Sequence, residues 1–256
     1  MIANYHAHTT RCRHAYGTET EDVEKALERG LKIFGFSDHT PQFFPGDYYS
    51  FMRMYPQELD GYCSTVRNLQ KEYSGRIEIP LGLEAEYYPA IWGELLPRLQ
   101  DAGIEYLILG QHWLGHEQDE HGSGGITVSE NLLKQYCHQV MDGLSTGVFT
   151  YLAHPDLFHY IGSRKIYRKY MGELCRFARQ GGIPLELNLL GILCNKHYPN
   201  EEFFALAAEE GCSVILGMDT HDPAHISLPE PEEKALDMVR HFGLKLLDTV
   251  DLRPLK

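Results

Sequence analysis

Short runs of hydrophobic residues recur along the chain, and longer segments with a helical spacing of hydrophobic positions lie between them. In the first long segment, Thr18 and Glu21 have the spacing of a capping box and Gly30 is a typical helix stop. The short runs predict strands over 2–6, 32–38, 77–86, 105–112, 148–154, 183–188 and 213–219, and a further run at 244–247 could add an eighth. The long segments predict helices over 18–30, 56–73, 90–102, from the end of the polar loop 116–125 to about 146, 165–180, 200–210 and 230–242.

This alternation of strands and helices predicts an α/β protein with a parallel sheet. Seven or eight βα units follow one another without a linker, so we expect a single domain over 1–256, closed as a TIM-like (β/α) barrel. An open, doubly wound sheet is the alternative. No GxGxxG or Walker motif accompanies that alternative.

Histidine or an acidic residue stands at the carboxyl end of six of the seven predicted strands, and Asn188 ends the sixth strand. In a parallel barrel these ends face the same way, so the side chains would meet at one mouth. Imidazole nitrogens and carboxylate oxygens are ligands of zinc, manganese and iron. The pattern therefore predicts a catalytic centre of two to three divalent ions (Zn, Mn or Fe). Its candidate ligands are His6, His8, His14, His39, Glu84, His112, His154, Asp219 and His221.

The net charge of the chain limits the kinds of molecule that it is expected to bind. A net charge of −13 opposes binding to nucleic acid and to anionic membranes, and bound metal ions could offset it for an anionic substrate. No apolar run is long enough to span a membrane. The six cysteines form no CxxC motif and no export signal is visible, so we expect reduced thiols and a cytoplasmic protein. The oligomeric state stays open.

Six short motifs resemble those of one family. They are HAH at 6–8 with a further histidine at 14, SDH at 37–39, GLEAE at 82–86, GQH at 110–112, AHPD at 153–156 and MDTH at 218–221. Together they resemble the PHP (polymerase and histidinol phosphatase) superfamily along essentially the whole chain. The resemblance implies a distorted (β/α)7 barrel and three ions. The first ion would be held by His6, His8, Glu84 and Asp219. The second would share Glu84 as a bridging ligand and add His112 and His154, and the third would be held by His14, His39 and His221. Asp38 would support the ligands without binding an ion itself.

Within this superfamily, HTTRCRHA at 8–15 and GLEAEYYP at 82–89 look like the histidinol-phosphate phosphatase branch. The resemblance implies a phosphoric monoester hydrolase that uses a metal-bridging hydroxide to release phosphate from L-histidinol phosphate. Glu84, Asp219 and His221 would be its catalytic residues. Two features depart from the family pattern: Asn4 replaces a common aspartate, and LLGIL at 189–193 lacks the polar pair and the arginine that are familiar there.

The substrate's phosphate needs a basic side chain, and we consider Arg164, Arg11 and Lys196. The aromatic segment 43–55 could either stack on an imidazole-bearing substrate or pack as an ordinary loop. Three other functions remain open. A phosphodiesterase would need a basic groove, a C–N hydrolase would typically need a lysine at a strand end, and a non-enzymatic metal-binding protein would have a closed site.

Overall fold

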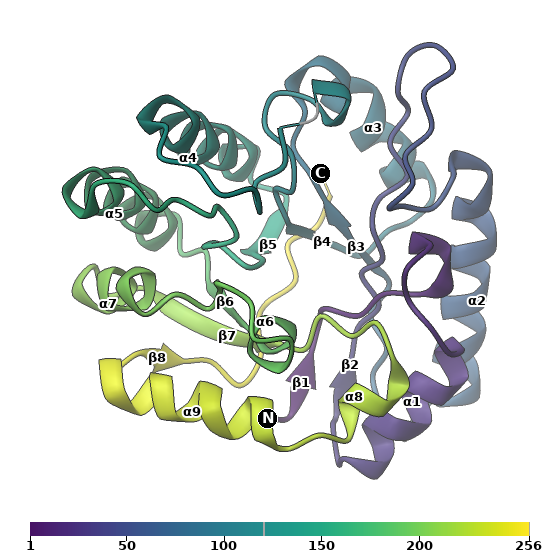
Figure 1. Ribbon diagram of the computed structural model, residues 1–256. Coiled ribbons are helices and arrows are strands. Elements are labelled where there is room, and N and C mark those ends of the chain that lie inside the picture. The colour runs from purple at the N-terminus through teal and green to yellow at the C-terminus, as the bar shows by residue number, and fades with distance from the viewer. Residues whose placement is uncertain (120, 256) are drawn as a thin grey trace.

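The computed structural model describes residues 1–119 and 121–255, and in these ranges helices surround eight short parallel strands (Figure 1). The strands are β1 Ala3–Asn4, β2 Ile33–Phe34, β3 Gly82–Ala85, β4 Tyr106–Leu109, β5 Phe149–Leu152, β6 Leu185–Asn188, β7 Ser213–Gly217 and β8 Lys245–Leu246. The α-helices are α1 Glu19–Glu28, α2 Leu59–Glu72, α3 Pro89–Asp101, α4 Glu130–Ser145, α5 Arg164–Gln180, α6 Leu189–Leu193, α7 Glu201–Glu209, α8 Pro223–Ile226 and α9 Glu230–Phe242. None of the described helices is both long and apolar enough to cross a lipid bilayer.

The strands follow one another around a ring. β1 pairs with β2, and β3 to β8 form a second sheet in sequence order. Parallel bridges Phe36↔Leu81 and His39↔Glu84 join β2 to β3, and the bridge Ala7↔Thr220 joins the extensions of β1 and β7. Among the strands that the structure describes, β8 pairs with the start of β7 alone. The predicted distorted (β/α)7 barrel is therefore confirmed, and the open doubly wound sheet was wrong.

The helices agree with the hydrophobic pattern, and the capping box of Thr18 and Glu21 is present at the start of α1. The predicted helix 56–73 begins as a 3-10 turn, Pro56–Glu58, and continues as α2. Four short helices were not predicted: the 3-10 helices Thr10–Cys12 and Glu117–Asp119, α6 and α8. All four are too short to show a hydrophobic period, and Thr10–Cys12, α6 and α8 each begin at a polar side chain that caps them.

The inside of the barrel is filled by a small hydrophobic cluster. Tyr5, Tyr106 and Tyr151 belong to it, and the hydroxyl of Tyr106 donates to the carbonyls of Tyr5 and Phe36. The chain after β8 packs on this cluster through Leu247, Val250 and Leu252, so it closes the amino-terminal end of the barrel. The polar side chains are consequently gathered at the carboxyl ends of the strands.

Candidate metal centre

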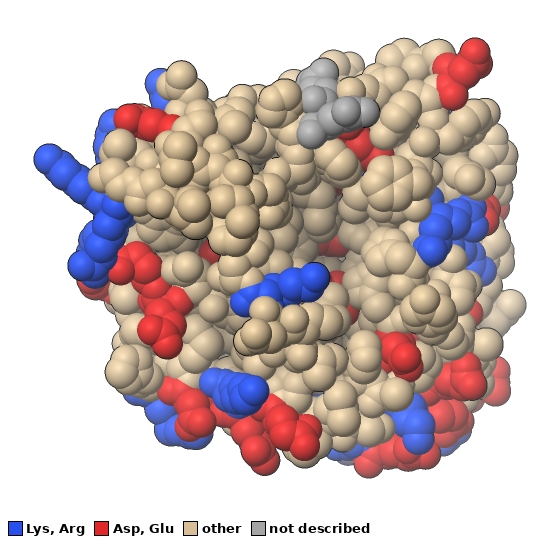
Figure 2. All heavy atoms as spheres, in the orientation of Figure 1, with Lys and Arg blue, Asp and Glu red and all other residues tan. Residues whose placement is uncertain are grey.

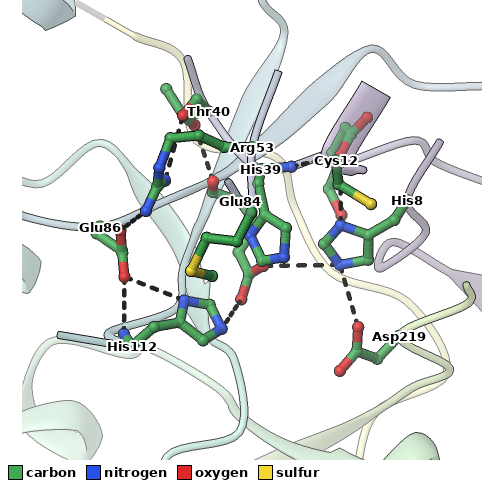
Figure 3. A network of polar contacts seen from close by, with 12 residues as sticks. His8, Cys12, His39, Thr40, Arg53, Glu84, Glu86, His112 and Asp219 are labelled. Atoms are coloured by element: carbon green, nitrogen blue, oxygen red, sulfur yellow. Dashed lines mark hydrogen bonds and ion pairs between the residues drawn. The ribbon is translucent and has the colours of Figure 1, made fainter. Parts of the chain in front are cut away.

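All nine predicted ligands lie in one cluster at the carboxyl ends of the strands. They come from the extensions of β1, β2, β4, β5 and β7, from β3 itself, and from the loop after the Thr10–Cys12 turn. Neighbouring imidazole rings lie 4.2–5.7 Å apart between centroids, as in the pairs His8–His221 and His6–His154. Figure 3 shows His8, His39, His112 and Asp219 converging around Glu84. Side chains that are far apart in the sequence are thus brought together as predicted.

Glu84 lies at the centre of the cluster and is almost fully buried. Its Oε1 is 2.7 Å from His154 Nε2 and 3.6 Å from His112 Nε2. Its Oε2 is 2.9 Å from His39 Nδ1 and 3.6 Å from His8 Nε2. The two oxygens therefore face two different groups of histidines, which is the arrangement that a bridging carboxylate requires.

A second part of the cluster consists of imidazoles. The Nδ1–H groups of His14 and His221 donate to the carbonyls of Cys12 and Asp219, at 2.8 and 2.9 Å. Each Nε2 consequently carries a lone pair, and the two Nε2 atoms are only 3.0 Å apart. Such lone pairs repel unless a proton or a cation lies between them. His39 completes this group, with one donor atom of each of the three histidines within 4.8 Å of the others.

His6, His8 and Asp219 form the third part. Asp219 Oδ1 is 3.0 Å from His8 Nε2 and 3.4 Å from His6 Nε2. Both Nε2 atoms and Glu84 Oε2 are buried, and although ion-pair contacts of 2.9 and 3.0 Å reach Glu84 Oε2 and His8 Nε2, none of the three atoms makes a well-directed hydrogen bond with a described residue. Buried polar atoms without a partner are rare and costly, and these belong to residue types that bind transition metals. The residues present therefore fit divalent metal ions.

The backbone is unusual at two of the predicted ligands. His154 and Asp219 have φ angles of 27° and 53°, in the left-handed region that few non-glycine residues adopt. Both follow the last residues of a strand, β5 and β7. Strain of this kind is concentrated at functional sites, where the surrounding structure holds it.

Glu186 in β6 was not predicted, although it supports the cluster directly. Its Oε1 accepts the Nδ1–H of His6 at 2.7 Å, and its Oε2 accepts the backbone N–H of His154 at 2.8 Å. Asn188 Nδ2 donates to Glu186 Oε2 at 2.9 Å and to Asp219 Oδ2 at 3.1 Å. A carboxylate on the second nitrogen of a histidine fixes its tautomer and orientation. The signal was an acid within the apolar strand LELN, two positions before Asn188 and so on the same face.

Glu86 was missed in the same way. Its Oε1 accepts both the backbone N–H and the Nδ1–H of His112, at 3.0 and 3.2 Å. Burial alone would raise the pKa of Glu86, but the neighbouring Arg53 and His112 outweigh it and lower that pKa to about 2. In GLEAE, Glu86 lies two residues after Glu84 and therefore on the same face, which is the signal that could have found it.

Two glycines make room for these carboxylates. A Cβ atom at Gly110, just after β4, would overlap Oε1 of Glu84, and one at Gly217, the last residue of β7, would overlap Oε1 of Glu186. Asp38, expected to support the ligands, is buried and accepts the backbone N–H of His39 at 2.7 Å.

The ionised carboxylates of the cluster favour the presence of positive charge beside them. Burial alone would lower the pKa of His8, but the carboxylates of Asp219 and Asp38 outweigh it and raise that pKa to about 9. Burial and the charge of His8 lower the pKa of His221 to about 3. The pKa of Glu84 lies well below its ordinary value because the surrounding histidines overcome the effect of burial. The carboxylates therefore stay ionised and attract either protons or metal ions.

The predicted phosphate-binding side chains lie outside this cluster of nine. Arg11 forms an ion pair with Glu19, and Arg164, whose side chain is 75% exposed, pairs with Glu202. Lys196 is exposed and forms no ion pair with any residue that the structure describes. Figure 2 shows a hollow near the middle of the face, with acidic side chains in its depth and a lysine or arginine at its margin. The role of these three side chains stays a prediction.

Comparisons with known proteins agree with this geometry. A probable histidinol-phosphatase from Deinococcus radiodurans is 29% identical over 240 residues, which cover 88% of each chain. The histidinol-phosphatase of Bacillus subtilis is 23% identical over 256 residues, covering 86% of this chain and 94% of the relative. A solved structure is that of the histidinol phosphate phosphatase of Lactococcus lactis subsp. lactis, in complex with zinc, L-histidinol and phosphate. Its TM-score is 0.72 at 20% sequence identity, and the match covers 100% of this chain and 98% of that chain, so the two proteins share a fold.

A family model adds a match along the chain itself. The PHP domain model matches residues 4–189, which contain every predicted ligand except Asp219 and His221. Those two follow β7 and complete the cluster in space. The resemblance seen in the sequence motifs is thereby confirmed, and the chain belongs to the PHP domain family.

Proposed function

We propose that this protein is a metal-dependent phosphomonoesterase that hydrolyses L-histidinol phosphate to L-histidinol and phosphate, a reaction of histidine biosynthesis. The observation that carries the proposal is the position of Glu84, whose two oxygens face separate groups of histidines. The relatives named as histidinol-phosphatases, and the related structure with L-histidinol and phosphate, support this choice of substrate. We further propose that 1–256 acts as one domain on a small molecule, in the cytoplasm.

The proposed centre holds two to three divalent ions, with zinc, manganese and iron as the candidates. When bound, such ions neutralise phosphate charge and provide a nucleophile from water at neutral pH. Glu84 would be shared between the first two sites. The proposed ligand sets are His6, His8, Glu84 and Asp219 for one ion, Glu84, His112 and His154 for the next, and His14, His39 and His221 for the third.

The leaving alkoxide must receive a proton. Asp219 and His221 are the proposed helpers beside the reacting phosphate, although both are better placed as ligands. The Nδ1–H of His221 is already donated to the carbonyl of Asp219, so only its Nε2 faces the cluster.

A basic side chain should hold the outer phosphate oxygens. No arginine follows Gly191 and Ile192, where the family pattern has one, so another cation must act. The backbone N–H of Lys196 donates to the carbonyl of Gly191 at 2.9 Å, and this proximity supports Lys196 as the replacement. Because Arg11 and Arg164 already pair with acids, we expect Lys196→Met to raise KM at least tenfold, and Arg11→Met and Arg164→Met to change KM less. Equal KM values for Lys196→Met and wild type would exclude this lysine.

The decisive experiment measures phosphate release from L-histidinol phosphate by protein reconstituted with manganese or zinc, with generic phosphomonoesters in parallel. A strong preference for L-histidinol phosphate would support the proposal. Release only from other phosphomonoesters would move it to a different small substrate. Release only from phosphodiesters would indicate a phosphodiesterase, and no release at all a metal-binding protein.

Substitution of the central carboxylate tests the metal mechanism separately. Glu84→Gln should abolish turnover and reduce the metal content of the protein, because Glu84 faces both histidine groups. A Glu84→Gln protein with full activity and full metal content would refute the shared-ligand arrangement.

A further inference from the structure

One arginine is buried among the loops at the mouth of the barrel. Arg53 lies in the segment between β2 and α2 and is only 2% exposed. It forms ion pairs with Glu86, which follows β3, and with Glu117, which follows β4. A buried charge is costly unless its partners and hydrogen bonds are complete. Arg53 therefore joins three successive loops at a single guanidinium group.

All three nitrogens of this guanidinium are engaged. Nε donates to Glu117 Oε2 at 2.9 Å and to the hydroxyl of Ser50 at 3.2 Å. Nη1 donates to the carbonyl of Thr40 at 3.3 Å, and Nη2 bonds both Glu86 and Glu117. A planar group with donors on every side is fixed in position as well as in charge, and a lysine could not reproduce this geometry.

The fixed guanidinium reaches the metal centre through one carboxylate. Arg53 holds Oε2 of Glu86, which also accepts the hydroxyl hydrogen of Tyr88 at 2.7 Å. The other oxygen of Glu86 accepts both N–H groups of His112, so His112 presents Nε2 toward Glu84. Figure 3 shows this chain from Arg53 through Glu86 to His112.

We infer that Arg53 is a positioning residue for the metal centre: it immobilises Glu86, and Glu86 fixes the orientation and tautomer of His112. The inference rests on the proposed function, in which His112 is a metal ligand. It also gives the segment 40–55 a role, since Thr40, Ser50 and Arg53 tie that segment to the centre.

A purely structural role for Arg53 makes a different prediction. If the guanidinium only anchors loops, its replacement lowers the melting temperature and leaves metal affinity unchanged. If it positions His112, metal binding weakens selectively at one site. Arg13 is a matched control, because it belongs to the neighbouring mouth loop but contacts Glu58 and the ring of Tyr55 at the surface.

The test is a titration of metal-free protein with zinc against a chromophoric chelator, together with ¹¹³Cd NMR of the cadmium-loaded protein. The variants are Arg53→Lys, Arg53→Met and Arg13→Met, and His112→Asn identifies which ion depends on His112. We expect both Arg53 variants to lower the affinity for that ion by about 10- to 100-fold, as happens when a metal ligand loses its hydrogen-bond partner. The cadmium resonance of that site should shift as well. Arg13→Met should bind all ions as the wild type does.

The inference is overturned if the Arg53 variants bind every ion with wild-type affinity and only melt at a lower temperature. If Arg53→Met does not fold, Arg53→Lys and Glu117→Gln decide by the same measurement. A wild-type protein that binds no zinc would instead refute the proposed metal centre, and with it this role for Arg53.

Discussion

Replacement of Glu186 by glutamine tests how the centre is organised. Glu186 accepts two N–H groups at Oε2, from His154 and Asn188, and one at Oε1, from His6. A glutamine has one acceptor end, and it satisfies most donors by turning its oxygen toward His154 and Asn188. Its NH2 group then faces Nδ1 of His6. To accept that hydrogen bond, His6 must move its proton to Nε2, the atom that would bind the metal.

The loss of the hydrogen bond between Glu186 and His6 determines the expected decrease in metal affinity. A hydrogen bond to a charged group contributes about 1.5–3 kcal/mol. If that amount is lost only when the ion is bound, the affinity of the ion that uses His6 falls by about 10- to 150-fold. We expect kcat to fall with it when zinc is limiting, and to recover partly at high zinc concentration. Zinc titration and steady-state phosphate release measure the two effects.

The control is Glu78→Gln, an exposed carboxylate that precedes β3 at the other end of the barrel. It should leave zinc affinity and kcat unchanged. The reasoning fails if Glu186→Gln binds zinc as tightly as the wild type, because the tautomer of His6 would then not depend on Glu186.

Two further predictions concern stability as well as activity. Gly110→Ala should displace Glu84, and so lower both kcat and the free energy of unfolding, the latter by about 1–3 kcal/mol. The control is Gly61→Ala in α2, where no atom lies within 4 Å of the added Cβ. In urea unfolding this control should be neutral or stabilising. Asp22→Asn should stabilise the protein at pH 8 and have little effect near pH 4. Burial raises the pKa of Asp22 from 3.8 to about 8, so the folded state keeps a proton that the unfolded chain releases, and stability is lost as pH rises between these values. Each unit of difference is worth about 1.4 kcal/mol, and an unchanged pH profile in Asp22→Asn would contradict this assignment.

The barrel could be predicted because its signal is local. Each βα unit shows a hydrophobic run followed by a helical period, and chain order alone places neighbouring strands side by side. Strand lengths could not be predicted in the same way. β1 and β2 have two residues each, because their extensions toward the mouth pair only through isolated bridges such as His39↔Glu84 and Ala7↔Thr220. These extensions carry candidate ligands, and the irregular ladder leaves their side chains free to turn inward.

The nine candidate ligands could be found in the sequence because histidine is rare and its placement at strand ends is conspicuous. Their supporting residues look ordinary in the sequence. Glu186 reads as one acid in an apolar strand, and Arg53 as one cation in an aromatic loop. What distinguishes Arg53 is its contact with Glu117, 64 positions away, which exists only after three loops have closed over the mouth. Such pairings depend on loop conformation, which carries no periodic signal.

The supporting groups also indicate which of the proposed ions would be held least tightly. His6 and His112 are each backed by a carboxylate, and the ions assigned to them share the charge of Glu84. The ligand set of the third proposed site, by contrast, contains three imidazoles and no carboxylate, and of these His39 contacts Glu84 through its other ring nitrogen, Nδ1. Attraction between a divalent ion and an anionic ligand strengthens binding in a buried site, so the third ion lacks the largest favourable contribution.

Exposure adds to this difference, because His14 lies at the surface whereas His6 and Glu84 are buried. We therefore expect dialysis against a weak chelator to remove the third ion first, and His14→Asn to abolish that ion while the other two stay bound. Metal analysis of the dialysed protein checks the order. Simultaneous loss of all ions would show that the three sites form a single cooperative unit and that the charge of Glu84 is distributed over the whole centre.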